Sequence, residues 1–426
     1  MLQQVNVGHK SLGDYATLAT RGLMEQIRGL AEPLAGKKVL HLSATAFGGG
    51  VAEINYTLIP LMTDVGLDTE WRIIHGEDEF FEVTKTIHNA LQGHPEGLSK
   101  EQEEIFRRYN ELNAAQLEGE YDFVIVHDPQ PAAVRDHFPS SDTRWIWRCH
   151  IDLSTPNEQV LDFLLPSIRR YDATVFHRRE YVPDAPDLPM AAIWPPAIDP
   201  LAPKNMALSP DDATYIVDQF GIDVARPLIT QVSRFDPWKD PLGVIDAYRL
   251  VKEEYPEVQL ALVGSMAHDD PEGWDFYNQT VSYAGGDPDV YILSNLNNIG
   301  AVEVNAFQVD SAAVLQKSIR EGFGLTVSEA LWKARPTVAG RVGGIVDQIQ
   351  DGVTGWLVDS STEAAEACMS ILSDPAAARE RALRGKEHVR RNFLTPRLLR
   401  DWLVLFNRLL GNDIVGAEIA TVAAPA

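Results

Sequence analysis

The chain has 426 residues, of which 45% are hydrophobic and 23% charged, a composition typical of a folded globular protein and not of a disordered one. Its formal net charge of −24 argues against general binding to nucleic acid or to anionic membranes, because both need a basic surface. Its two cysteines cannot build a disulfide framework, no apolar run is long enough to span a bilayer, and the first residues lack a secretory pattern. We therefore expect a cytoplasmic protein that binds neither nucleic acid nor membrane.

Short apolar runs alternate with longer stretches of helical period along most of the chain. In the first half the runs are 39–42, 71–74, 123–126, 145–147 and 173–176, and in the second half they are 228–232, 260–263, 290–293, 312–315 and 337–339. This alternation predicts parallel sheets covered by helices. Continuous apolar runs, in place of strict alternation, are typical of strands that are buried on both faces.

A proline-rich segment interrupts this series once. Pro195, Pro196, Pro200 and Pro203 lie too close together for a helix or a central strand, so the segment is predicted to be a linker. We predict two doubly wound α/β (Rossmann-like) domains, residues 1–199 and 200–395, which face each other across a cleft. A helix and a loosely ordered tail after Gly411 are expected in residues 396–426. Ligands of such sheets bind at the carboxyl ends of the strands, where the candidate motifs are found.

Three consecutive glycines, Gly48 to Gly50, follow the first apolar run and precede a helical stretch that contains Glu53. Glycines allow positive φ and close approach of the backbone to a ligand, and a helix N-terminus directs N–H groups at anions or hydroxyls. The segment is neither G-x-G-x-x-G nor a P-loop. A tight strand-to-helix turn without a ligand is the alternative.

Two cations, Arg234 and Lys239, lie on one short loop after the strand predicted at 228–232. Fixed cations at a sheet edge suit a diphosphate, whose oxygens become more negative as the bond to them breaks. The alternative is a surface loop in which these cations pair with Asp236 and Asp240.

Two carboxylates, Glu321 and Glu329, lie eight positions apart around the turn Gly322 to Gly324. Sugar hydroxyls donate strong hydrogen bonds to ionised carboxylates, so the pair suits a polyol ligand. A helix N-terminal glutamate stabilised by the helix dipole is the alternative for Glu329, and pairing with Arg320 or Lys317 is another.

Histidine and aspartate recur together after two strands of the first half. His127 and Asp128 follow one strand, and His150 and Asp152 follow the next. A single histidine is more often structural, but two such pairs at neighbouring strand ends favour contact with a ligand. No His, Cys or carboxylate set has zinc-type spacing. The sequence Asp287-Pro288-Asp289 resembles a metal-binding Asp-x-Asp, but it lies in a turn before a strand.

Together these motifs resemble the GT-B retaining glycosyltransferases of family 4. The resemblance is carried by the Gly48–Gly50 loop, by Arg234 with Lys239, and by the E-x7-E spacing of Glu321 and Glu329, and it extends from residue 40 to about residue 410. Within that family the chain is similar to the trehalose glycosyltransferring synthases at residues 48–53, 80–93, 127–131, 148–154 and 269–274.

This resemblance implies reversible transfer of glucose from a nucleotide-diphosphate glucose to glucose, which forms trehalose with retained configuration. Residues implied as catalytic are Glu321, Arg234, Lys239 and His150, the last approaching the donor sugar from the opposite domain. Residues implied as donor-binding are Gly49, Gly50, Arg234, Lys239, Gly322, Phe323, Gly324, Leu325 and Glu329, the last at the ribose, and those assigned to the acceptor are Glu53, Asp128 and Asp152. No metal or other cofactor is implied, and the last helix is expected to cross back to the first domain.

Three other functions remain open from the sequence. A trehalose phosphorylase would use inorganic phosphate, a family 4 glucosyltransferase could take another small polyol or a hydroxy acid as acceptor, and a non-catalytic sugar-binding protein belongs to a different class. The sequence does not determine the nucleotide base or the preferred direction. It also leaves the oligomeric state open, for which a homodimer is one candidate.

Overall fold

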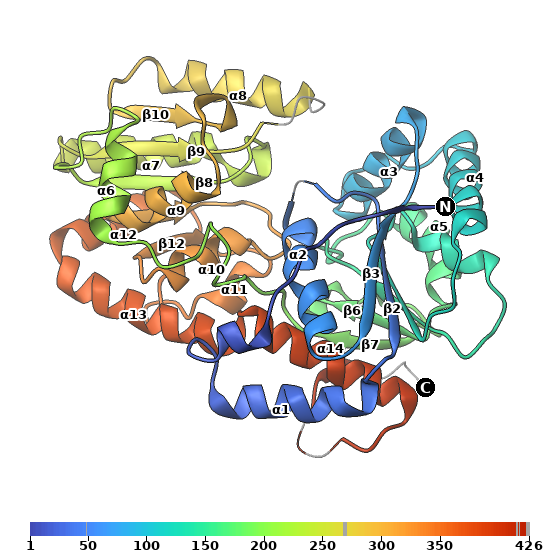
Figure 1. The fold of residues 1–426 in the computed structure, drawn as a ribbon. Coiled ribbons are helices and arrows are strands. Elements are labelled where there is room, and N and C mark those ends of the chain that lie inside the picture. Colours follow the sequence, from blue (N-terminus) through green and yellow to red (C-terminus); the bar gives the residue numbers. More distant parts are fainter. Residues whose placement is uncertain (48, 267–270, 415, 417, 423–426) are drawn as a thin grey trace. The chain divides into compact units, whose positions relative to one another are not determined.

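The computed structural model describes residues 1–47, 49–266, 271–414, 416 and 418–422. The chain divides into two compact units, the first comprising Met1–Pro196 with Thr395–Ala426 and the second comprising Ala197–Leu394. Gly48, Asp269 and Asp270, which belong to motifs singled out in the sequence, lie outside the described residues. Each unit is built on its own sheet (Figure 1).

The first unit contains an eight-stranded sheet in the order β1-β3-β2-β4-β5-β6-β7-β14. Its strands are β1 (Gln3–Gln4), β2 (Lys38–Ser43), β3 (Asp68–Ile73), β4 (Phe123–His127), β5 (Arg144–Arg148), β6 (Ala173–Phe176), β7 (Met190–Ile193) and β14 (Ala420–Val422). The six inner strands are parallel, and β1 and β14 pair antiparallel at the two edges. The predicted parallel sheet is therefore confirmed, with two additional edge strands.

Both faces of this sheet are covered because its inner strands are apolar on both sides. Leu40 and Trp147 belong to the core on one face, together with Phe80 of α3 (Asp78–Leu91) and residues of α4 (Lys100–Gln116) and α5 (Glu158–Ile168). On the other face, Phe123 stacks on Phe406 of α14 (Thr395–Leu410), with ring centroids 4.3 Å apart. Helix α14 also packs against α1 (Arg21–Ala31) and α2 (Gly49–Asp64), as Figure 1 shows.

The second unit contains a six-stranded, fully parallel sheet in the order β10-β9-β8-β11-β12-β13. Its strands are β8 (Leu228–Val232), β9 (Gln259–Val263), β10 (Val290–Leu293), β11 (Ala313–Gln316), β12 (Thr337–Gly340) and β13 (Trp356–Val358). Its helices are α6 (Pro210–Asp218), α7 (Pro241–Glu254), α8 (Pro271–Ala284), α9 (Ala301–Asp310), α10 (Leu325–Trp332), α11 (Ile345–Gln348), α12 (Ser361–Ser373) and α13 (Pro375–Asn392). Helices α7 and α12 pack together on one face, whereas α6 and α9 cover the other.

The tail after Gly411 differs from the sequence-based expectation of a loosely ordered segment. Strand β14 pairs with β7, with Ala420 opposite Ile193 and Val422 opposite Ala191. This pairing has a physical reason, because β7 would otherwise present unpaired N–H and C=O groups along an open edge. Among the helices that the structure describes, none is both long and apolar enough to cross a bilayer.

Candidate active site

The basic loop after β8 holds its two cations in different ways. Arg234 lies 3.2 Å from the Asp236 carboxylate, and its side chain remains 69% exposed. Lys239 is only 15% exposed, and its Nζ lies 2.5 Å from Oε2 of Glu321. Strand β8 also holds the loop, because Nε2 of its residue Gln231 donates to the backbone oxygen of Lys239 at 2.7 Å. The pairing of Arg234 with Asp236, one of the sequence-based alternatives, is therefore present.

The turn that carries Glu321 follows β11 and leads into α10. Gly324 has φ of +80°, a left-handed conformation that glycine adopts without strain, and it forms the N-cap of α10. The side chain of Phe323 is buried, so only its backbone can face a ligand. Gln348 of α11 donates from Nε2 to the backbone oxygens of Phe323 and Gly324, which ties the turn to the neighbouring helix. This role of Gln348 could not be predicted from the motifs.

Glu329, on α10, lies in a different environment from Glu321. Its side chain is 1% exposed, and its Oε1 is 3.4 Å from Nζ of Lys204, the residue directly after the proline-rich segment. Lys333, one turn along the helix, donates to the backbone oxygen of Glu329 and to Oδ1 of Asn205. Burial lowers the pKa of Lys333 to about 7. The structure therefore surrounds Glu329 with lysines that motif spacing did not reveal.

A second ion pair joins the same two loops. Lys317, which follows β11 and is 8% exposed, pairs with Oδ2 of Asp240. Asp240 has φ of +49° and caps α7 by accepting from the backbone N–H of Gly243 at 3.0 Å. Together with the pair between Lys239 and Glu321, this contact fixes the basic loop against the glutamate turn at two points.

The glycine loop of the first unit forms the start of α2. Gly49 has φ of +80°, and Gly50 continues the helix, so the tight turn given as the alternative is present, and contact with a ligand stays a prediction. Glu53 lies on the exposed side of the first helical turn. Phe47, directly before the loop, is 77% exposed, which is unusual for so large an apolar side chain.

The predicted acceptor residues after β4 and β5 also hold the backbone in place. Asp128 has φ of +65°, and its Oδ1 accepts from the backbone N–H of His150 at 2.7 Å. Burial raises the pKa of the Asp128 carboxyl to about 7. Asp152 is buried, and its Oδ1 accepts from the backbone N–H of Ser154 at 2.8 Å. His150 is half-buried, and its Nε2 lies 2.9 Å from Nδ1 of His127.

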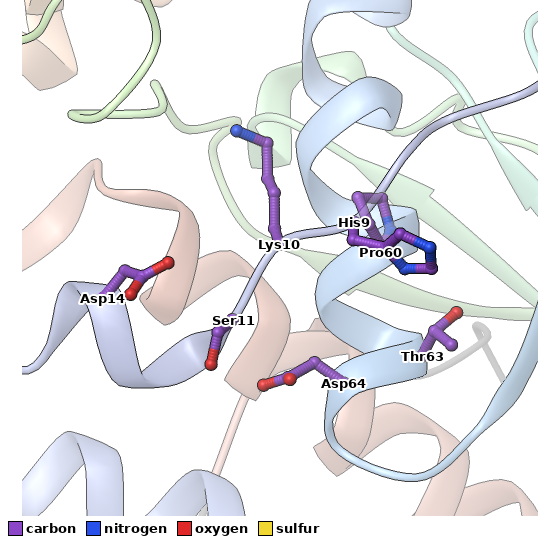
Figure 2. Close-up of a pocket in the computed structure, with 7 residues that line it drawn as sticks. All are labelled: His9, Lys10, Ser11, Asp14, Pro60, Thr63 and Asp64. Carbon is purple, nitrogen blue, oxygen red and sulfur yellow. The ribbon is translucent and has the colours of Figure 1, made fainter.

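A cavity of about 320 Å³ in the first unit lies away from these residues. Figure 2 shows the residues that line it, which are His9, Lys10 and Ser11 on the segment before the first 3₁₀ turn, Asp14 on that turn, and Pro60, Thr63 and Asp64 on α2. Asp64 already accepts from the backbone N–H of Leu12 at 2.7 Å. The lining residues on α2 belong to its C-terminal part, whereas the glycine loop forms the N-terminal end of the same helix. We therefore do not assign the cavity to the candidate site.

Both carboxylates of the Asp287–Asp289 turn form ion pairs with side chains of the same unit. Lys252 lies 2.9 Å from both carboxylates, and Arg226 lies 2.8 Å from Asp289. These cations supply the charge that a metal would otherwise provide. Within the described part of the chain, no group of three or more His, Cys, Asp or Glu side chains is arranged to hold a metal ion.

Known protein families match both units. Residues 41–183 match the family described as "Trehalose synthase, N-terminal domain", and residues 213–388 match "Glycosyl transferases group 1". The trehalose synthase of Rubrobacter xylanophilus is 62% identical over 96% of this chain and 100% of its own length, and that of Pyrococcus horikoshii is 45% identical over 96% and 99%.

Among solved structures, the sucrose-phosphate synthase of Thermosynechococcus elongatus matches 88% of this chain and 99% of its own with a TM-score of 0.67. At 17% identity this likeness concerns the fold, which is the GT-B arrangement of two parallel-sheet α/β domains. The predicted fold class and the predicted family are both confirmed. The chain is a glycosyltransferase and belongs to the trehalose synthase family.

Proposed function

We propose that this glycosyltransferase transfers glucose reversibly from a nucleotide-diphosphate glucose to glucose, forming trehalose with retained configuration. The observation that carries the proposal is the contact between Lys239 and Glu321, a cation and a carboxylate brought together from loops after two neighbouring strands. In this assignment Lys239 and Arg234 bind the diphosphate, and Glu321 with the Gly322–Gly324 backbone binds the sugar. The 62% identity to a trehalose synthase supports the choice of substrates.

The chemistry of the second unit suits departure of a nucleoside diphosphate. As the glycosidic C–O bond breaks, negative charge grows on the leaving phosphate oxygen. A cation fixed at that oxygen stabilises the transition state more than the ground state, and this difference accelerates the reaction. Lys239 is fixed because Glu321 and the Gln231 contact limit its motion.

The proposal is tested by incubating the purified protein with ADP-, UDP- or GDP-glucose and with glucose. We expect a non-reducing disaccharide and free nucleoside diphosphate, and the reverse reaction from trehalose and the same diphosphate. Formation of glucose 1-phosphate from trehalose and inorganic phosphate, without any nucleotide-dependent activity, would show a phosphorylase. Transfer to glycerol or glycerate but not to glucose would keep the glycosyltransferase and overturn the acceptor.

The transfer is expected to need no divalent metal. Lys239 and Arg234 provide positive charge at the proposed diphosphate position, where other transferases use a metal ion. Activity should therefore stay within about twofold of its starting value after dialysis against EDTA, as measured by release of nucleoside diphosphate. Loss of activity in EDTA, followed by recovery with Mg²⁺ or Mn²⁺, would contradict this assignment of the two cations.

Asp152 is expected to contribute to the acceptor site. Because its carboxylate also accepts a hydrogen bond from the Ser154 backbone, the test variant should preserve that bond. Asp152→Asn keeps an oxygen that can accept from the Ser154 N–H but removes the charge. A hydrogen bond to a charged group contributes about 1.5–3 kcal/mol, so the acceptor KM should rise about 10- to 100-fold while the donor KM changes little. Asp162→Asn, at an exposed position of α5, is the matched control. A larger change in donor KM than in acceptor KM would remove Asp152 from the acceptor site.

A further inference from the structure

Histidines form a diagonal row across neighbouring strands of the first unit. His41 of β2 is opposite Ile125 of β4, two positions before His127. His127 is in turn opposite Arg148 of β5, two positions before His150. Because side chains two positions apart in a strand point to the same face, His41 and His127 are presented on one face of the sheet. His150, two residues past the end of β5, lies beside His127.

The three rings are joined by hydrogen bonds. Nδ1 of His41 is 3.0 Å from Nε2 of His127, and Nδ1 of His127 is 2.9 Å from Nε2 of His150. Successive rings are stacked, with centroids 5.3 and 5.2 Å apart and planes 20° and 19° from parallel. His41 and His127 are buried, whereas His150 is half-buried. We call these three residues the histidine ladder.

Burial favours the neutral form of all three rings. Burial lowers the pKa of His41 to about 3 and lowers those of His127 and His150 well below the usual range. The guanidinium of Arg148 lowers the latter two further, and Asp128 is the carboxyl that contacts the His150 backbone. Each neutral imidazole carries one N–H, so the hydrogen bonds along the ladder must all point the same way.

The buried end of the ladder determines this direction. Nε2 of His41 is buried and has no hydrogen-bond partner among the residues that the structure describes, and Trp402 of α14 packs edge-on against the ring. If Nε2 carried the proton, a buried N–H would be unsatisfied, which is rarer in proteins than an unused acceptor. The proton of His41 is therefore on Nδ1 and is donated to His127. His127 then donates from its own Nδ1 to His150, whose remaining proton is also on Nδ1.

We propose that His41 and His127 are positioning residues that fix the ring orientation and the tautomer of His150, so that His150 presents its Nδ1–H as a donor to a sugar hydroxyl. This inference rests on the proposed function and on the position of His150 at the donor sugar, which the family resemblance implies. The two buried histidines do not touch substrate. They act through His150, in the way that a partner on one ring nitrogen sets the state of the other.

Two substitutions of His41 separate hydrogen bonding from packing. His41→Phe keeps the ring but removes the N–H, whereas His41→Asn is smaller but keeps a donor near the Nδ1 position. We expect kcat to fall at least tenfold in His41→Phe and to stay within about threefold of wild type in His41→Asn. Trp402→Phe, which changes packing against the same ring, should keep the wild-type kcat. The reverse order, with His41→Phe active and His41→Asn impaired, would mean that the ring only fills space and would overturn the proposal.

The tautomer itself can be read without substrate. In ¹⁵N-histidine-labelled full-length protein between pH 6 and 8, NMR should show His150 protonated at Nδ1 and unprotonated at Nε2, and His41→Phe should weaken this preference. Protonation of His150 at Nε2, or a charged imidazolium, would overturn the ladder. The two failures are distinguishable, because a wild-type protein without transferase activity contradicts the proposed function whatever the NMR result. An active enzyme with the opposite tautomer contradicts only the ladder.

Discussion

Lys239→Ala is expected to lower kcat by about 10²-fold or more, equivalent to about 2.7 kcal/mol of activation free energy. Lys239 is the better fixed of the two cations, because it is mostly buried and contacts Glu321, whereas Arg234 is largely exposed and contacts its loop neighbour Asp236. Arg234→Ala should therefore lower kcat as well, but by less than Lys239→Ala. This order distinguishes a preorganised cation from one that is ordered only when the donor binds.

Steady-state kinetics with saturating donor and acceptor measure this effect. Arg341→Ala is the matched control, because Arg341 is likewise a cation in ion pairs, with Asp351 and Asp359, but lies outside the candidate loops. Near-normal turnover in both Lys239→Ala and Arg234→Ala, with unchanged donor affinity, would show that the diphosphate binds elsewhere. If Lys239 and Glu321 act as a unit, the double variant should lose little more than the worse single variant.

The protein should lose stability when the pH falls from 7.5 to 5.5. In the unfolded chain histidine has a pKa near 6.5, whereas burial in the folded protein lowers that of His41 to about 3. The stability that this neutral histidine contributes is complete above about pH 6.5 and is lost toward pH 3, by about 1.4 kcal/mol for each pH unit. His127 and His150 act in the same direction, since their pKa values are also lowered by burial.

One carboxyl opposes this trend. Burial raises the pKa of Asp128 to about 7, so its contribution is complete below about pH 4 and is lost as the pH rises through 7. One such group offsets only part of the effect of three histidines, and the net free energy of unfolding should fall on acidification. Chemical denaturation at several pH values measures how steeply the free energy of unfolding depends on pH. This dependence should become weaker in His41→Phe. It should not change in the control His137→Phe, because His137 is exposed. Stability that is constant or rises toward pH 5.5 would contradict the buried, neutral ladder.

The parallel sheets could be predicted because their strands are apolar on both faces. A short apolar run such as Leu228–Val232 is typical of a buried strand, and β8 is found at those residues. Strand β7 was not predicted, because Met190–Ile193 is short, contains two alanines and directly precedes the proline-rich segment. Strand β14 could not be found from its own residues, since its partner β7 is more than 200 positions away and provides the edge that it covers.

Each candidate residue could be found from its own loop. The contacts between candidates depend on which strands are neighbours in the sheet, and a single loop does not show this. Lys239 and Glu321 were both singled out, but their mutual contact follows from the adjacency of β8 and β11. Lys204 lay outside the motifs and carried no local signal for its contact with Glu329, and Lys317, which was considered as a partner of the glutamates, pairs with Asp240. His41 was treated as part of an apolar strand, because only the alignment of β2 with β4 places it beside His127.

The position of α14 has a consequence for how the chain folds during synthesis. One face of the first unit is completed only by residues 395–410, where Phe406 covers Phe123 and Nδ2 of Asn407 donates to the backbone oxygen of Leu30 at 2.8 Å. The second unit, by contrast, is one continuous segment that ends just before this helix. The ribosome therefore releases all of the second unit before the first can bury its last apolar face. The unit that begins the chain is the last to finish folding, and its exposed rings must be kept from aggregating throughout the synthesis of nearly 200 further residues.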